Sequence, residues 1–98
     1  MKEIKAYIKV HKLNELMRVL KDDYNVHGVT VCQNHLSGIQ DIYLDELLDY
    51  VRVDFVCKRE YVEEIIDDIK TFSRTGLRND GKIFILPVEQ VIEISDEP

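Results

Sequence analysis

Residues 50–72, YVRVDFVCKREYVEEIIDDIKTF, contain the pattern that decides the fold. In its first part every second residue from Val51 to Cys57 is apolar, which predicts a strand with one buried face. In its second part apolar residues recur at i, i+3, i+4 and i+7 from Val62 to Ile69. That spacing predicts an amphipathic helix over roughly residues 59–72.

The N-terminal part of the chain has the same order of patterns. Apolar residues alternate from Ile4 to Val10 and then recur with helical spacing from Leu13 to Leu20. These patterns predict a strand followed by a helix over roughly residues 13–23, and VHGVTVCQ, residues 26–33, predicts the next strand.

The C-terminal part predicts two short strands. They are KIFILPV, residues 82–88, and QVIEI, residues 90–94. Pro87 cannot donate a hydrogen bond to a sheet, so it marks an edge or a break between them.

These elements define the predicted fold. The order is β-α-β-β-α-β with a short extra C-terminal strand, which is an α+β, ferredoxin-like sandwich. The length of 98 residues fits a single domain over residues 1–98. Residues 34–49 are ambiguous, because DIYLDELLD, residues 41–49, fits either a short helical turn or an ordered loop.

Composition narrows the classes of function. The formal net charge of -6 argues against general binding of DNA or RNA, but it allows a local pocket for one nucleotide. No secretory signal or membrane span is recognisable, and Cys32 and Cys57 lie in apolar segments. We therefore expect reduced, buried thiols and a cytoplasmic protein.

Familiar enzymatic and metal-binding patterns are missing from the sequence. The three histidines have no metal-ligand spacing with one another or with the cysteines. No nucleophile has a nearby base in a recognisable motif. We therefore expect no catalytic residue and no metal site.

Residues 75–84, TGLRNDGKIF, hold more turn chemistry than a simple reversal needs. Gly76 and Gly81 would allow backbone N–H groups to face an anion, beside the positive charge of Lys82. Thr75 and Asn79 offer side-chain hydrogen bonds. The alternative is a helix C-cap at Gly76 followed by an Asn-Asp-Gly turn, and the residues alone leave both interpretations open.

The same stretch, with VEQVIEI after it, resembles the C-terminal signature of the PII signal-transduction family. That signature comprises a T-G, a G-D-G-K phosphate loop and an I-F strand. MKEIKAYIKVHKLNELMRVL is similar to the first strand and helix of the family. HGVTVCQ resembles its G-hydrophobic-T-V strand, and SGIQ resembles the G-x-Q before its T-loop. The resemblance covers nearly the whole chain except residues 41–49.

The resemblance implies a trimer of ferredoxin-like subunits that binds an adenine nucleotide in the clefts between subunits. It also implies a regulatory role toward a protein partner such as a membrane transporter, which would recruit this cytoplasmic protein to the membrane. No cofactor and no catalytic activity are implied. The positions that match the nucleotide site of the family are Gly28, Thr30, Gly38, Gln40, Asp54, Val56, Asn79, Asp80, Gly81 and Lys82.

Two departures from the family pattern change these expectations. Glu93 and Ser95 stand where the family usually has two phosphate-clamping arginines, and a carboxylate repels a polyphosphate. A less negative ligand, such as AMP, ADP or a cyclic dinucleotide, therefore fits better than ATP. The T-loop is also shortened to residues 41–49, which serve either as a lid or as a helix that docks a partner.

Two hypotheses follow. The first is a trimeric adenine-nucleotide sensor that switches a partner. The second is an interaction module of PII shape whose nucleotide pocket has degenerated, with a link to the transport of metals or bicarbonate.

Overall fold

The computed structural model describes residues 1–24, 26–33, 50–77 and 80–95. The interpretation of residues 41–49 as a lid or docking helix therefore lies outside the described residues. The strands are β1 (Lys2–Lys9), β2 (His27–Gln33), β3 (Tyr50–Cys57) and β4 (Gly81–Pro87), and the helices are α1 (Leu13–Val19) and α3 (Val62–Ser73). Short 3₁₀ turns, Val10–Lys12 and Arg59–Tyr61, precede the helices, and a π-helical turn, Leu20–Tyr24, follows α1.

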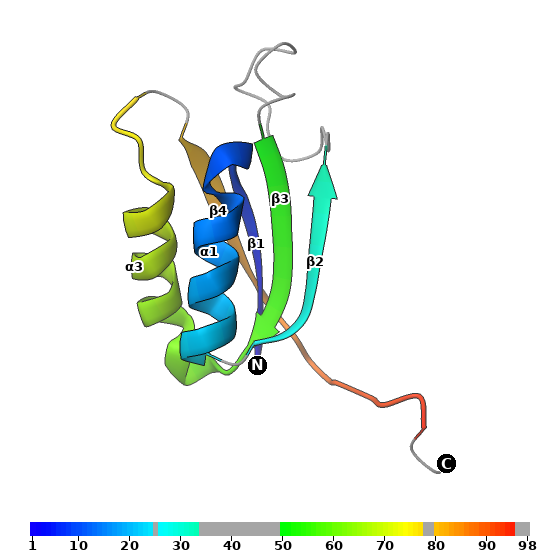
Figure 1. The fold of residues 1–98 in the computed structure, drawn as a ribbon. Coiled ribbons are helices and arrows are strands. Elements are labelled where there is room, and N and C mark those ends of the chain that lie inside the picture. Colours follow the sequence, from blue (N-terminus) through cyan, green and yellow to red (C-terminus); the bar gives the residue numbers. More distant parts are fainter. Residues whose placement is uncertain (25, 34–49, 78–79, 96–98) are drawn as a thin grey trace.

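The strands form one sheet in the order β2-β3-β1-β4, and each neighbouring pair is antiparallel. Both helices pack on one face of this sheet, as Figure 1 shows. The α+β, ferredoxin-like fold predicted from the two periodicities is confirmed.

The hydrophobic core lies between the sheet and the helices. The core-facing residues predicted for β1 and β3 are confirmed, because Ile4, Ile8, Val53 and Phe55 are at most 1 % exposed. Burial does not alternate strictly, because Tyr7 and Asp54 on the opposite face are buried as well. The helices contribute the residues that their spacing predicted. The fully buried ones are Leu16, Leu20, Ile65 and Ile69.

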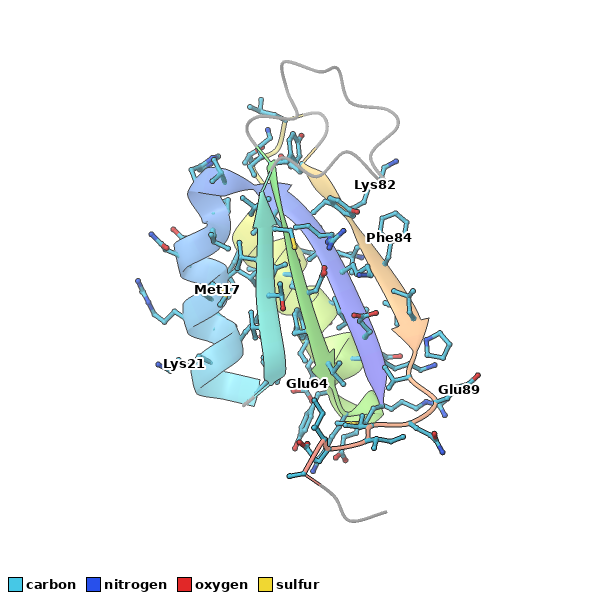
Figure 2. The ribbon with its side chains drawn as sticks, turned by 90° about the vertical axis from the view of Figure 1, so that its right-hand side faces the viewer. Met17, Lys21, Glu64, Lys82, Phe84 and Glu89 are labelled. Atoms are coloured by element: carbon cyan, nitrogen blue, oxygen red, sulfur yellow. The ribbon has the colours of Figure 1, made fainter. Side chains whose placement is uncertain are left out.

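Neither α1 nor α3 covers the opposite face of the sheet, here called the open face (Figure 2). It carries an ionic cluster in which Asp54 contacts Lys5 Nζ at 3.3 Å and Arg52 Nε at 2.9 Å. Burial would lower the pKa of Arg52, but the Tyr7 hydroxyl and Asp54 outweigh it and raise that pKa. Tyr7 also packs edge-on against Phe84, with ring centroids 5.8 Å apart.

The predicted extra strand over residues 90–94 is wrong. The last backbone hydrogen bond along β4 runs from Val88 N to Met1 O at 3.2 Å, and residues 88–93 have no regular structure. The chain leaves the body of the domain after β4 (Figure 1). Since β1 begins at Lys2, opposite Pro87, none of the four described strands lies beside residues 90–94 to pair with them.

Candidate functional site

Asp80 organises the turn that links α3 to β4. Its Oδ2 accepts hydrogen bonds from the backbone N–H of Thr75 at 2.9 Å and of Gly76 at 3.2 Å. Its Oδ1 accepts one from the Thr75 hydroxyl and lies 3.4 Å from Lys9 Nζ. Burial would raise the pKa of Asp80, but these hydrogen bonds from Thr75, Lys9 and Gly76 outweigh it and lower that pKa.

The anion nest predicted near Gly76 is thus filled by a carboxylate of the chain itself. The Leu77 N–H is also satisfied internally, because it donates to the Thr75 hydroxyl at 3.2 Å. The N–H groups of residues 75–77 therefore hold the turn in shape.

Gly81 is required by the packing of the backbone. Its φ is +136°, and a Cβ added there would lie 1.8 Å from the carbonyl oxygen of Tyr7 on β1. Only a residue without a Cβ allows β4 to begin this close to β1. Gly81, which belongs to the predicted phosphate loop, is therefore needed for the packing of β4 against β1 whether or not a ligand binds.

A cavity of about 340 Å³ lies beside this turn, between α3 and β4. Four isoleucines from the two elements form its apolar lining, here called the isoleucine floor: Ile66, Ile69, Ile83 and Ile85. Lys70 and Arg74, both exposed, lie on the α3 side. The hydroxyl of Ser73 is buried at this cavity and has no hydrogen-bond partner among the described residues.

The predicted residues Asp80, Gly81 and Lys82 also line this cavity. Lys82 pairs with Tyr7 in the β1–β4 register, so it belongs to the open face of the strand, and Figure 2 shows it at the edge of the sheet with Phe84. With Lys9, Lys70 and Arg74 nearby, this edge gathers positive charge in a chain whose net charge is -6. That local charge is suited to an anion.

The other predicted residues that the structure describes lie on β2 and β3, away from the β4 edge. Gly28, with a φ of +63°, lies at an irregularity in β2, where the pairing with β3 shifts by one residue, and Thr30 pairs with Asp54. Thr30 is exposed and Val56 is half-buried, whereas Asp54 is held in the ionic cluster.

A single chain does not bring these two groups together. The edge strands β2 and β4 are separated by β3 and β1, which places them on the order of 14 Å apart across the sheet. Gly38, Gln40 and Asn79 lie outside the described residues, so their predicted roles stay predictions.

Sequence reasoning missed four contributors to the site: Lys9, Lys70, Ser73 and Arg74. Lys70 and Arg74 are spaced i, i+4 at the end of a helix, which is the usual place for cations that complement the helix dipole. That spacing was the available signal. Lys9 reaches the site because β1 ends beside the turn. Its contact Thr75 is 66 residues away in the sequence, so no local pattern indicates it.

Within the described ranges, no three side chains of His, Cys, Asp or Glu gather as metal ligands would. In the same part of the chain, neither helix is long and apolar enough to span a bilayer.

The fold and this cavity define a small ferredoxin-like domain with a cationic edge. The family model described as nitrogen regulatory protein P-II matches residues 1–98. The chain is 34 % identical to the nitrogen regulatory protein P-II of Azospirillum brasilense over 103 residues, with 96 % of this chain and 91 % of the relative covered. It is 35 % identical to that of Rhizobium meliloti and 36 % identical to that of Cereibacter sphaeroides, with the same coverage.

The chain therefore belongs to the nitrogen regulatory P-II family of signal-transduction regulators. Like these relatives, it is a regulatory protein and not an enzyme.

Proposed function

We propose that this protein is a P-II-type regulator that binds an adenine nucleotide and changes the activity of a protein partner, such as a membrane transporter. The observation that supports it most is the cavity of about 340 Å³ at the Asp80–Lys82 turn, with Lys70 and Arg74 beside it. Its volume falls in the range of small-molecule sites, and its apolar floor with a few cations suits a base and its phosphate.

The proposed site is completed by a second copy of the chain. Thr30 and Val56 lie toward the β2 edge, whereas Lys82 lies on the β4 edge. A ring of copies joined edge to edge would bring the β2 side of one subunit to the β4 side of the next. A homotrimer, which the family resemblance implied, is such a ring.

Binding would be transmitted by residues 36–49, which include Gly38 and Gln40, two positions that match the nucleotide site of the family. A ligand biases this segment only if it binds two of its arrangements unequally. The partner would then recognise one arrangement, and a membrane transporter would bring the cytoplasmic regulator to the bilayer.

A second candidate is an interaction module with a degenerate pocket. Two observations favour it. The Asp80 carboxylate already accepts hydrogen bonds from the N–H groups of Thr75 and Gly76, which a phosphate would otherwise use. Glu93 places a negative charge where the family usually has an arginine. In that case the partner would be bound without a nucleotide.

Calorimetric titration with ATP, ADP, AMP and a cyclic dinucleotide separates the two functions. We expect micromolar binding of at least one of them, and binding at least about tenfold weaker in Lys82→Ala, because one charge-assisted contact is lost. Lys58→Ala, at an exposed lysine beyond the end of β3, is the matched control and should bind as the unsubstituted protein does. If none of the four ligands binds to a well-formed oligomer, the degenerate-pocket function replaces this one.

A further inference from the structure

The end of α3 carries two cations whose charge is not neutralised within the described part of the chain. Lys70 and Arg74 are exposed and line the α3–β4 cavity, and neither forms an ion pair with a described residue. Lys9, by contrast, is already paired with Asp80 at 3.4 Å. The charge of Lys70 and Arg74 is therefore available to a ligand in this cavity.

Ser73 lies between these two cations in the sequence and lines the same cavity. The residue is 6 % exposed, and its hydroxyl is buried without a hydrogen-bond partner among the described residues. A buried hydroxyl without a partner is costly, and most such groups in proteins are satisfied. Rotation about the Cα–Cβ bond of this serine, from one staggered position to another, can direct its O–H toward a ligand.

The electrostatics of a helix end have to be overcome before an anion binds there. The last carbonyl groups of a helix together carry roughly half a negative charge, which repels anions. The Arg74 N–H satisfies one of these carbonyls, because it donates to Lys70 O at 3.1 Å. The two full positive charges of Lys70 and Arg74 exceed what remains, so the end of α3 attracts an anion.

A single phosphate group matches this set of side chains. A phosphate monoester has a charge of about −2 near neutral pH and several strong acceptor oxygens. Two cations balance that charge, and lysine and arginine are the usual partners of phosphate in proteins. The isoleucine floor beside them is apolar and suits the base of a nucleotide.

We propose that the end of α3 holds one phosphate group of the ligand, with Lys70 and Arg74 as its cations and the Ser73 hydroxyl as a further donor. The base then lies on the isoleucine floor. That this phosphate belongs to an adenine nucleotide rests on the proposed function, whereas the binding of phosphate at this helix end does not.

Titration with inorganic phosphate tests the helix end without any nucleotide. In amide NMR spectra we expect phosphate to shift the signals of residues 70–76 most strongly and to saturate them. Lys70→Gln with Arg74→Gln should abolish these shifts. The matched control, Arg18→Gln with Lys21→Gln, removes the same charge from exposed positions on α1 and just after it, and should leave the shifts unchanged.

Two results of this titration would overturn the proposal. One is the lack of a shift at residues 70–76. The other is a set of shifts that do not saturate and are equally large around Arg18 and Lys21, which would mean an adventitious ion only.

Calorimetry with adenosine and with the tightest-binding of the four nucleotides assigns the phosphate to the helix end. The nucleotide should bind at least about tenfold more tightly than adenosine, which lacks the charged contact. In Lys70→Gln with Arg74→Gln this advantage should fall below about twofold, while adenosine binds as before. Lys70→Arg with Arg74→Lys keeps both charges and should keep most of the advantage. An undiminished advantage in the glutamine variant would overturn the assignment and leave the proposed function in place.

Ser73→Ala separates a ligand contact from a structural role. Because the hydroxyl has no partner among the described residues, its removal should leave the urea midpoint of unfolding unchanged or raise it. The same variant should bind the nucleotide about fivefold more weakly. A lower midpoint with unchanged affinity would overturn the part played by Ser73. Phosphate binding at residues 70–76 in a protein that binds none of the four nucleotides would count against the proposed function alone.

Discussion

Replacing Gly81 by alanine is expected to destabilise the protein by at least about 3 kcal/mol, or to prevent folding. The added Cβ would lie 1.8 Å from Tyr7 O and 3.0 Å from Tyr7 C, both of which are backbone atoms of β1. A flexible side chain could move aside, but β1 is central in the sheet and is paired on both sides. The strand pair β1–β4 would have to separate at its Gly81 end.

Gly76→Ala and Gly28→Ala are the matched controls. Both glycines have positive φ, +82° and +63°, yet nothing lies within 4 Å of an added Cβ. Each should therefore cost only the conformational term of about 1–2 kcal/mol. Urea unfolding of the three variants measures the difference. Equal stability of Gly81→Ala and Gly76→Ala would contradict the close approach of β4 to β1. Because Gly81 is structural, Lys82 is the better position for testing the ligand.

The second large effect is expected at Asp54, which sequence reasoning placed in the nucleotide site. Its side chain is 12 % exposed and contacts Arg52 and Lys5, whose side chains are 14 % and 28 % exposed. Asp54→Ala would remove the carboxylate nearest to Arg52 and Lys5, leaving Lys5 only Glu3 at 3.9 Å, at a cost of about 2–3 kcal/mol. Glu64→Ala, at an exposed residue of α3, should change stability by less than about 0.5 kcal/mol.

A double substitution shows whether the charges themselves are needed. Arg52→Met with Asp54→Leu removes both partners and should recover most of the lost stability, as buried ion pairs replaced by apolar residues often do. Denaturant unfolding of the single and double variants gives the coupling energy between the two positions. If Asp54→Ala unfolds at the same urea concentration as the unsubstituted protein, the cluster does not stabilise the open face.

The elements that could be predicted are those whose patterns depend on local period. The core-facing residues of β1 and β3 and of α3 follow the local period of strand and helix, so the sequence was sufficient for them. The burial of Tyr7 and Asp54 on the open face does not follow from that period. The prediction of a strand over residues 90–94 was wrong because alternation shows only that a segment is able to pair with another strand. Whether a partner strand lies beside it depends on the rest of the sheet.

The candidate site was less predictable, because its contacts also depend on segments that are distant in the sequence. Lys82 was recognisable from the turn sequence and Asp80 from the family resemblance, but the hydrogen bonds from Thr75 and Gly76 to Asp80 depend on how the turn closes. The contact of Lys9 with Asp80 and the contact of Gly81 with Tyr7 are made between strands far apart in the sequence. No local pattern contains that information.

The central proposal is a nucleotide site shared by two copies, and mixing two defective variants tests it most directly. Lys82→Glu damages the β4 side of the site, and Thr30→Arg, at an exposed position, damages the β2 side. Neither variant alone should bind the nucleotide found for the unsubstituted protein. After the two are dissociated, mixed in equal amounts and reassembled, about a quarter of the sites should combine two intact sides and bind again. Mixed oligomers that regain no binding, or single variants that retain it fully, would contradict a site built from both edges.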